Sequence, residues 1–182
     1  MSKIIIFPTD TVYGIGCQIF DVEGIEKIYK IKKRDHNKPL ACLCSSLEQI
    51  EKIAIVDETS MKLINEFMPG GLTLILKAKK EVETKIGYKT IGVRIPNYVL
   101  ALDILNNMGP MLVTSVNESG QVALNDYEEI KKQYSAYVEE IYPPNQISSN
   151  IASTVIDMTK EELRILREGS ITLDDIKKAL DE

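Results

Sequence analysis

The sequence predicts one α/β domain over residues 1–182, with a twisted mixed (parallel and antiparallel) sheet flanked by helices. Two observations support this fold class. Short apolar runs of strand length alternate along the chain with segments in which apolar residues recur every three or four positions. In addition, a length of 182 residues suits a single domain, and no repeat, low-complexity stretch or linker divides the chain.

The strands are predicted from runs of β-branched and other apolar residues. The first run is Ile4-Ile5-Ile6-Phe7, and the clearest buried run is Leu72-Thr73-Leu74-Ile75-Leu76. The predicted strands cover residues 4–7, 12–19, 40–44, 72–76, 91–95, 111–114, 154–158 and 163–167.

The helices are predicted from capping residues that precede an apolar face. Asp21 begins the first helix, and Asn97 and Thr172 begin two later ones. Asn125 with Glu128 resembles a capping box and predicts a long helix that stops before Pro143-Pro144. The predicted helices cover residues 21–29, 46–53, 57–68, 97–105, 125–141 and 172–180.

The composition is that of an ordinary soluble protein, with 44% hydrophobic residues. No apolar run approaches the length of a transmembrane helix, and Met1-Ser2-Lys3 leads directly into a strand, so we expect a cytoplasmic protein without a membrane anchor. Cys17, Cys42 and Cys44 are too few for a disulfide framework and, with a single histidine, do not suggest a zinc site. We expect three buried, reduced thiols.

The formal net charge of −5 argues against a protein that coats nucleic acid. Cationic residues are nevertheless concentrated in one stretch, from Lys27 to Lys38. Such a stretch on an acidic protein suits a small anionic ligand such as a nucleotide, held by guanidinium forks and ammonium groups. The alternative is a solvated helix end whose lysines are favoured by the helix dipole.

Polar clusters stand at the ends of several predicted strands, where chains often place ligand-binding groups. Arg94 is informative because an arginine within an apolar strand is unfavourable unless it is paired or meets an anion. No Walker loop, Rossmann glycine fingerprint, zinc-binding helix or nucleophile elbow occurs in the sequence, so we expect chemistry based on positioning and charge. The clusters lie at residues 8–16, 32–40, 92–96, 114–120, 153–157 and 165–169.

Seven motifs, six of them within these clusters and one at residues 69–74, carry a resemblance to a known family. They are, in order, Pro-Thr-Asp-Thr-Val-Tyr-Gly, Lys-x-Arg with Lys-Pro-Leu, Pro-Gly-Gly-Leu-Thr-Leu, Val-Arg-Ile-Pro, Ser-Val-Asn-x-Ser-Gly, Ser-Thr-Val-Ile-Asp and Leu-Arg-Glu-Gly. Between Pro8 and Gly169 the chain resembles the threonylcarbamoyl-AMP synthase family, which has a YrdC-type domain. The resemblance implies a nucleotidyltransferase that makes threonylcarbamoyl-AMP and pyrophosphate from ATP, L-threonine and bicarbonate, for threonylcarbamoyladenosine modification of tRNA.

The resemblance also implies a role for particular residues. The residues implied on the threonine side are Thr11, Arg94, Ser115 and Ser153. Those implied on the ATP side are Lys32, Arg34, Lys38, Thr90, Asn117, Asn125 and Arg167. No side chain is expected to act as a covalent nucleophile or to bind a metal, and Mg²⁺ would enter with the ATP phosphates. Further implied partners are downstream tRNA-modification proteins, with weak binding of tRNA itself.

The chain departs from the family's usual pattern at several places. Asp35 stands where proline commonly follows Lys-x-Arg, Val116 replaces alanine and adds bulk beside the expected nucleotide, and Leu43 stands where many members have a histidine. Only residues 1–7 precede the first motif, where members usually carry a helix, and we expect no extra C-terminal domain. The missing helix predicts an exposed apolar strip and therefore self-association. These departures bear on the level of activity rather than on the fold.

Two alternative functions remain open from the sequence. One is a non-catalytic RNA- or nucleotide-binding regulatory paralogue on the same fold, although the pI near 5.1 weighs against RNA binding. The other is carbamoyl chemistry on a different substrate, as in the related domain of hydrogenase maturation proteins. That domain normally accompanies zinc-finger-like cysteines, which this sequence lacks.

Overall fold

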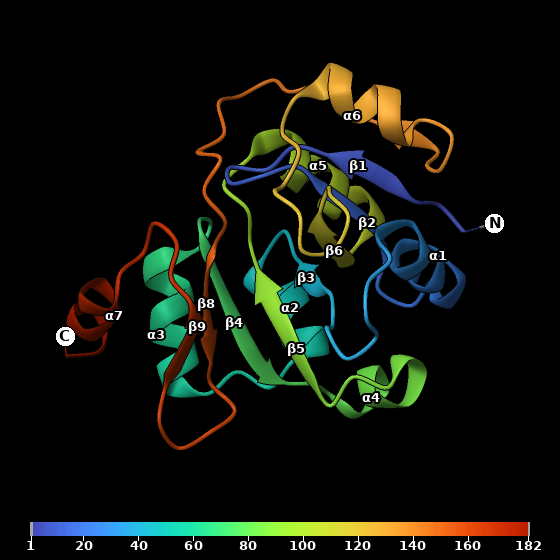
Figure 1. Cartoon of the computed structure of the whole chain (residues 1–182). Helices are drawn as coiled ribbons and strands as arrows, with labels where there is room; N and C mark the ends of the chain where they lie inside the picture. The colour runs from blue at the N-terminus through green and yellow to red at the C-terminus, as the bar shows by residue number, and fades with distance from the viewer. Residues whose placement is uncertain (1, 182) are drawn as a thin grey trace.

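The strands form one mixed sheet in the structure, a computed structural model that describes residues 2–181 (Figure 1). The strand order is β7-β1-β2-β6-β3-β5-β4-β8-β9. β1 pairs in parallel with β7, β3 with β5 and β4 with β8, whereas the other neighbours are antiparallel. The predicted α/β class and mixed sheet are therefore confirmed. The strands are β1 (Ile5–Phe7), β2 (Gly14–Gln18), β3 (Ala41–Leu43), β4 (Leu72–Lys77), β5 (Thr90–Arg94), β6 (Met111–Ser115), β7 (Glu140–Ile141), β8 (Thr154–Asp157) and β9 (Arg164–Arg167).

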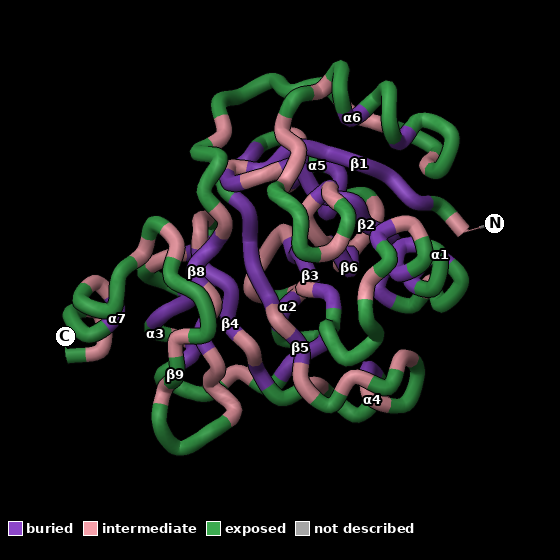
Figure 2. Tube along the Cα trace, viewed as in Figure 1, coloured by how far each residue is buried: buried purple, intermediate pink, exposed green. Residues whose placement is uncertain are grey.

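Helices flank the sheet, and two apolar clusters form the core. Because successive side chains of a strand point to opposite faces, Ile5 and Phe7 pack with α5 in the smaller cluster, whereas Ile4 and Ile6 belong to the larger one, with α1, α2 and α3. Figure 2 shows the strands largely buried and the outer turns of the helices exposed. The helices are α1 (Val22–Lys32), α2 (Leu47–Ile53), α3 (Glu58–Phe67), α4 (Lys80–Ile86), α5 (Val99–Met108), α6 (Tyr127–Tyr134) and α7 (Leu173–Asp181).

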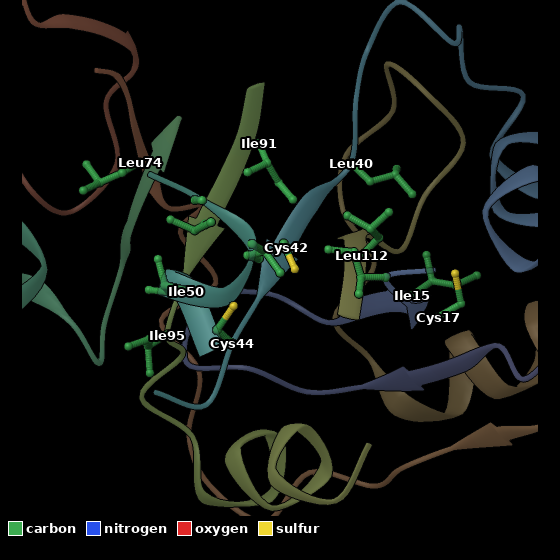
Figure 3. Packing of buried hydrophobic residues seen from close by; sticks show 14 of the residues in the cluster. Ile15, Cys17, Leu40, Cys42, Cys44, Ile50, Leu74, Ile91, Ile95 and Leu112 are labelled. Atoms are coloured by element: carbon green, nitrogen blue, oxygen red, sulfur yellow. The ribbon is translucent and has the colours of Figure 1, made fainter. Parts of the chain in front are cut away.

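The cysteines Cys17, Cys42 and Cys44 are free and lie in the larger apolar cluster, as Figure 3 shows. Burial raises the pKa of the Cys17 thiol to about 12, with a smaller contribution from the Asp21 carboxylate. The thiol is therefore protonated at neutral pH and behaves as a small apolar side chain. The prediction that all three thiols are buried is confirmed.

α4 is a helix that the sequence pattern did not predict. Val82 is its one buried residue, so the segment has no apolar stripe at helical spacing. Ion pairs between Lys80 and Glu83 and between Glu81 and Lys85 support it instead. Gly87 ends the helix with a φ of 75°, a conformation that glycine adopts without a steric penalty.

The predicted helix at 125–141 is wrong in its second half. α6 ends at Tyr134, and Glu140–Ile141 instead form β7 on the free edge of β1, because that edge offers unpaired backbone groups. The cap is also one residue later than predicted: the Asp126 carboxylate accepts from the Glu129 amide at 2.8 Å. Likewise Tyr98, not Asn97, precedes α5.

The N-terminal strand leaves no apolar strip exposed. Each residue from Ile4 to Phe7 is at most 1% exposed, since both faces of β1 are covered. No exposed apolar strip is therefore found on this strand, and self-association stays a prediction. Within residues 2–181, no helix has both the length and the apolar character needed to cross a membrane.

Candidate active site

A cleft of about 680 Å³ lies against one face of the central strands, and nine of the eleven predicted site residues line it. This volume falls within the range of small-molecule sites. Strand alternation explains the lining: Leu74 and Val93 point into the core, whereas Thr73, Gly92 and Arg94 stand on the cleft face. The predicted residues that line the cleft are Thr11, Arg34, Lys38, Thr90, Arg94, Ser115, Asn117, Ser153 and Arg167.

A crossing segment, residues 142–153, joins β7 at one edge of the sheet to β8 near the other (orange in Figure 1). Its amides at Ser149 and Asn150 donate to the carbonyls of Asp10 and Thr11, both at 2.9 Å. The buried Tyr98 hydroxyl fixes the start of the segment by accepting two backbone amides at 2.9 Å. The segment thereby holds the turn after β1 next to Ser153.

Arg94 is the most constrained cation of the cleft, with 5% of its surface exposed. Its Nε donates to the Gly70 carbonyl at 2.8 Å, its Nη1 to the Thr11 hydroxyl at 2.7 Å, and its Nη2 to the Asp10 carboxylate. Burial lowers the pKa of Arg94, and the Asp10 carboxylate opposes this shift, so the guanidinium remains charged. A guanidinium has five N–H groups, which leaves two of them for a carboxylate ligand.

Ser153 connects two strands at the same end of the cleft. Its hydroxyl lies 2.8 Å from that of Thr73 and accepts from Nη2 of Arg167 at 3.0 Å. The Nε of Arg167 also donates to the Ser153 carbonyl at 2.8 Å, and burial lowers the pKa of Arg167. The residues predicted for threonine and for ATP therefore meet at Ser153 and Arg167, where two substrates that react with each other would have to meet.

The segment from Arg34 to Leu40 forms another wall of the cleft. Arg34 donates from Nε to the Lys38 carbonyl at 2.8 Å and from Nη2 to the Pro39 carbonyl at 3.1 Å. These bonds hold the backbone of Lys38 and Pro39 against the Arg34 guanidinium. Lys38 itself lines the cleft. The cationic stretch is therefore part of the cleft wall and not only a solvated helix end.

Lys32 is a predicted ATP-binding residue that lies outside the cleft lining. It is 1% exposed, and its ammonium donates to the Ser115 carbonyl, to the Asn117 carbonyl at 2.7 Å and to the Asn117 Oδ1 at 2.9 Å. Burial, together with the charge of Arg34, lowers the pKa of Lys32 to about 8. All three ammonium protons are used, so the contribution of Lys32 is to support the loop that presents Ser115 and Asn117.

Asn125 is the second predicted residue that does not line the cleft. Its Oδ1 accepts from the Tyr13 amide at 3.0 Å, which ties the loop before α6 to the turn after β1. This bond occupies the side chain that the sequence suggested as a helix cap. Asn125 thus supports the first motif from outside the cleft.

Sequence reasoning missed Asp10 and Thr73 as parts of this site. Asp10 was quoted within a motif, but only the fold shows that it is the partly buried counter-charge of Arg94. Thr73 carried a readable signal, because it is the single polar residue in the apolar run of β4 and alternates with Leu72 and Leu74.

Gly169→Ala tests how closely the backbone packs beside Ser153. A Cβ atom at Gly169 would lie 2.2 Å from the Ala152 carbonyl oxygen and 2.8 Å from the Thr154 nitrogen, so backbone would have to shift. We expect a loss of about 2 kcal/mol in the free energy of unfolding, as for overpacked cores, measured by urea denaturation. Glu168→Ala, at the exposed neighbouring position, is the control and should change it by less than about 0.5 kcal/mol. Equal stability of both variants would contradict the close packing.

The family model for Sua5/YciO/YrdC proteins, described as "Telomere recombination", matches residues 1–169. The chain belongs to the Sua5/YciO/YrdC family. Within the family, a putative threonylcarbamoyl-AMP synthase of Methanocaldococcus jannaschii is 33% identical over 172 residues, which are 94% of this chain and 82% of that protein.

Solved structures of the Sua5/YciO/YrdC family have the same fold. Pyrococcus abyssi Sua5 complexed with L-threonine matches with a TM-score of 0.89 at 31% identity, covering 98% of this chain and 54% of that one. Escherichia coli YciO matches with a TM-score of 0.86 at 31% identity, covering 96% of this chain and 87% of that one. The chain thus spans about half the length of the Pyrococcus protein, which is named a threonylcarbamoyl-AMP synthase.

The departures from the family's motifs have local explanations. Val116 is fully buried in the larger apolar cluster and does not line the cleft, so the expected crowding of a nucleotide is contradicted. Asp35 builds the turn without proline: its Oδ1 accepts from the Asn37 amide at 2.9 Å and its carbonyl from the Lys38 amide at 3.0 Å. Leu43 does line the cleft, as an apolar contact.

Proposed function

We propose that this member of the family is an L-threonylcarbamoyladenylate synthase that makes threonylcarbamoyl-AMP and pyrophosphate from ATP, L-threonine and bicarbonate. One observation carries the proposal: four cations, Arg34, Lys38, Arg94 and Arg167, line one cleft. Among the residues described, Arg94 alone of these four forms an ion pair, with Asp10. The surplus positive charge suits two anionic ligands held side by side.

The reaction needs orientation and charge rather than a nucleophilic side chain. The threonine amine adds to the carbon dioxide that bicarbonate yields on losing hydroxide, and a proton leaves the nitrogen to give a carbamate. A carbamate oxygen then attacks the α-phosphorus of ATP, the bond from that phosphorus to the bridging oxygen breaks, and pyrophosphate leaves. Cationic donors offset the charge on the phosphoryl oxygens during this displacement.

The geometry suggests a role for each residue of the cleft. The two free N–H groups of Arg94 would hold the threonine carboxylate beside Thr11 and Ser153, with Ser115 on the same side. Arg34, Lys38, Thr90 and Asn117 would hold the nucleotide, and Arg167 would stand where the carbamate meets the α-phosphate. Lys32 and Asn125 would act by supporting the loops that carry these residues.

Mg²⁺ would accompany ATP and neutralise part of the triphosphate charge. Residues 2–181 contain no cluster of three or more histidine, cysteine, aspartate or glutamate side chains suited to a metal. At nucleotides Mg²⁺ is commonly held mainly by phosphate oxygens and water, and we propose the same arrangement here.

The relatives support this proposal to different degrees. The Pyrococcus Sua5 structure contains L-threonine, and the Methanocaldococcus relative is named as a putative synthase. YciO is as similar in sequence but is named as uncharacterised. The proposal extends to downstream proteins that would transfer the threonylcarbamoyl group to tRNA, with weak tRNA binding at most.

The decisive experiment is pyrophosphate release by the purified chain from ATP, bicarbonate and Mg²⁺, with and without L-threonine. We expect release that depends on threonine and on bicarbonate. Binding of ATP without threonine-dependent release would overturn the proposal in favour of a nucleotide-binding relative without this activity. Salt-sensitive retention of tRNA without turnover would instead favour an RNA-binding role.

A further inference from the structure

Two tyrosines that belong to none of the motifs support the nucleotide side of the cleft from behind. We propose that Tyr88, acting through Tyr29, is a positioning residue that holds the backbone at residues 38–40, so that Arg34 and Lys38 face the ligand. The inference rests on the proposed function, in which this wall of the cleft binds ATP.

The hydroxyls of the two tyrosines form a directed chain of hydrogen bonds. Tyr29 donates its single hydroxyl proton to the Lys38 carbonyl at 3.1 Å. The 3.1 Å contact between the two hydroxyls must then run from Tyr88 to Tyr29, and the Tyr88 oxygen accepts from the Leu40 amide at 3.2 Å. The chain therefore begins and ends on the two peptide groups that flank Pro39.

The same segment is also held by Arg34. Its guanidinium donates to the carbonyls of Lys38 and Pro39, and Pro39 itself has no amide to donate. Arg34 and the tyrosine pair together thus bind the carbonyls of Lys38 and Pro39 and the amide of Leu40. Loss of Arg34 or of the tyrosine pair would leave the backbone of residues 38–40 less constrained. Arg34 is aligned on this backbone, and Lys38 is part of it.

Open space lies beside the two tyrosine rings. A second hollow of about 430 Å³ lies behind the segment, lined in part by Tyr29, His36, Pro39 and Tyr88. His36 stacks on the Tyr29 ring with centroids 4.4 Å apart, but space remains beside both rings. Burial, and then the hydrogen bond with Tyr88, raise the pKa of Tyr29, so its hydroxyl is protonated and able to donate.

Tyr88 is positioned by α4, the helix that the sequence pattern did not predict. α4 ends at Gly87 in the left-handed conformation, and Tyr88 follows directly. Two residues later Thr90 begins β5 and lines both the cleft and the second hollow. The α4 connection therefore joins a cleft residue to the support of the neighbouring segment 38–40.

The test compares binding of ATP and of L-threonine to the full chain and to its Tyr88→Phe variant, by titration calorimetry. We expect Kd for ATP to rise about tenfold, because a backbone amide loses its acceptor, and Kd for threonine to stay within about twofold. Tyr29→Phe should behave alike, and the double variant should cost little more than either single one, because both residues form one chain. Tyr134→Phe removes the hydroxyl of a buried tyrosine of α6 outside the cleft lining, and both affinities should be unchanged.

A second measurement needs no ligand: hydrogen exchange at the Leu40 amide should accelerate about tenfold in Tyr88→Phe. Unchanged exchange, or an unchanged Kd for ATP, overturns the positioning role. An equal loss of ATP and threonine affinity overturns it as well, because it indicates general damage. A wild-type chain that fails to bind ATP overturns the proposed function instead, which keeps the two failures distinct.

Discussion

Arg94→Ala should abolish threonine-dependent pyrophosphate release, with kcat/KM for threonine falling by about 10³-fold. Removing one member of a buried, hydrogen-bonded charge pair typically costs about 4 kcal/mol, and each 1.4 kcal/mol corresponds to a factor of ten. Here the change removes the proposed carboxylate ligand and also leaves the Asp10 carboxylate without its partner. The measurement is a threonine titration of pyrophosphate release at saturating ATP.

Two controls separate lost binding from lost folding. Arg164→Ala removes an exposed arginine of β9 and should leave activity within about twofold. Arg94→Lys keeps the charge beside Asp10 but loses the guanidinium fork, so we expect a folded protein with a high KM for threonine. Threonine-dependent release that persists in a folded Arg94→Ala variant would show that the carboxylate is held elsewhere.

Lys32→Met should reduce kcat/KM for ATP by about 100-fold, because Ser115 and Asn117 lose the cation that holds their loop. Lys32 also gives the free energy of unfolding a pH dependence, and its sign is opposite to that of the activity. The pKa of Lys32 is about 8 in the folded chain against an ordinary 10.5, so between these pH values the unfolded chain binds more protons. Wild-type stability therefore rises with pH through this window, and the variant should lack that rise.

The same proton has an opposite effect on activity. A neutral amine has two N–H groups for the three acceptors around Lys32, so the loop loosens when the lysine loses its proton. We expect the wild-type kcat/KM for ATP to fall as the pH passes 8, and the pH profile of Lys32→Met to be flat in that region. A profile with the same decline in both proteins would contradict the role of Lys32.

The sequence predicted the strands and the cleft well where one local signal was sufficient. Alternation and apolar runs located β4 and β5, and the cost of placing Arg94 in an apolar strand already indicated a partner. Asp10 could not be identified as that partner, because the contact joins residues 84 positions apart. α4 was missed since surface ion pairs, not an apolar stripe, support it.

The wrong helix boundary and the untested role of Lys32 in ATP binding involve the same effect, which is competition for the same groups. Ile141 fits the helical spacing of α6, but the free edge of β1 takes residues 140–141 as a strand. Lys32 fits a cationic ligand site, but its ammonium group already donates hydrogen bonds to the carbonyls of Ser115 and Asn117. A local sequence pattern indicates which interactions a residue is able to make, but the tertiary structure determines which partner it actually contacts.

The crossing segment also has a consequence for biosynthesis. It ties residues 149 and 150 to Asp10 and Thr11, and Arg167 closes on Ser153 beside it, so the cleft is built from both ends of the chain. A ribosome-bound chain that has not yet released residue 167 already contains Arg94 and the basic stretch but has no complete cleft. A bound ligand stabilises only a folded chain that has a complete binding site. Truncated products therefore gain no stability from the ligand and stay exposed to proteolysis.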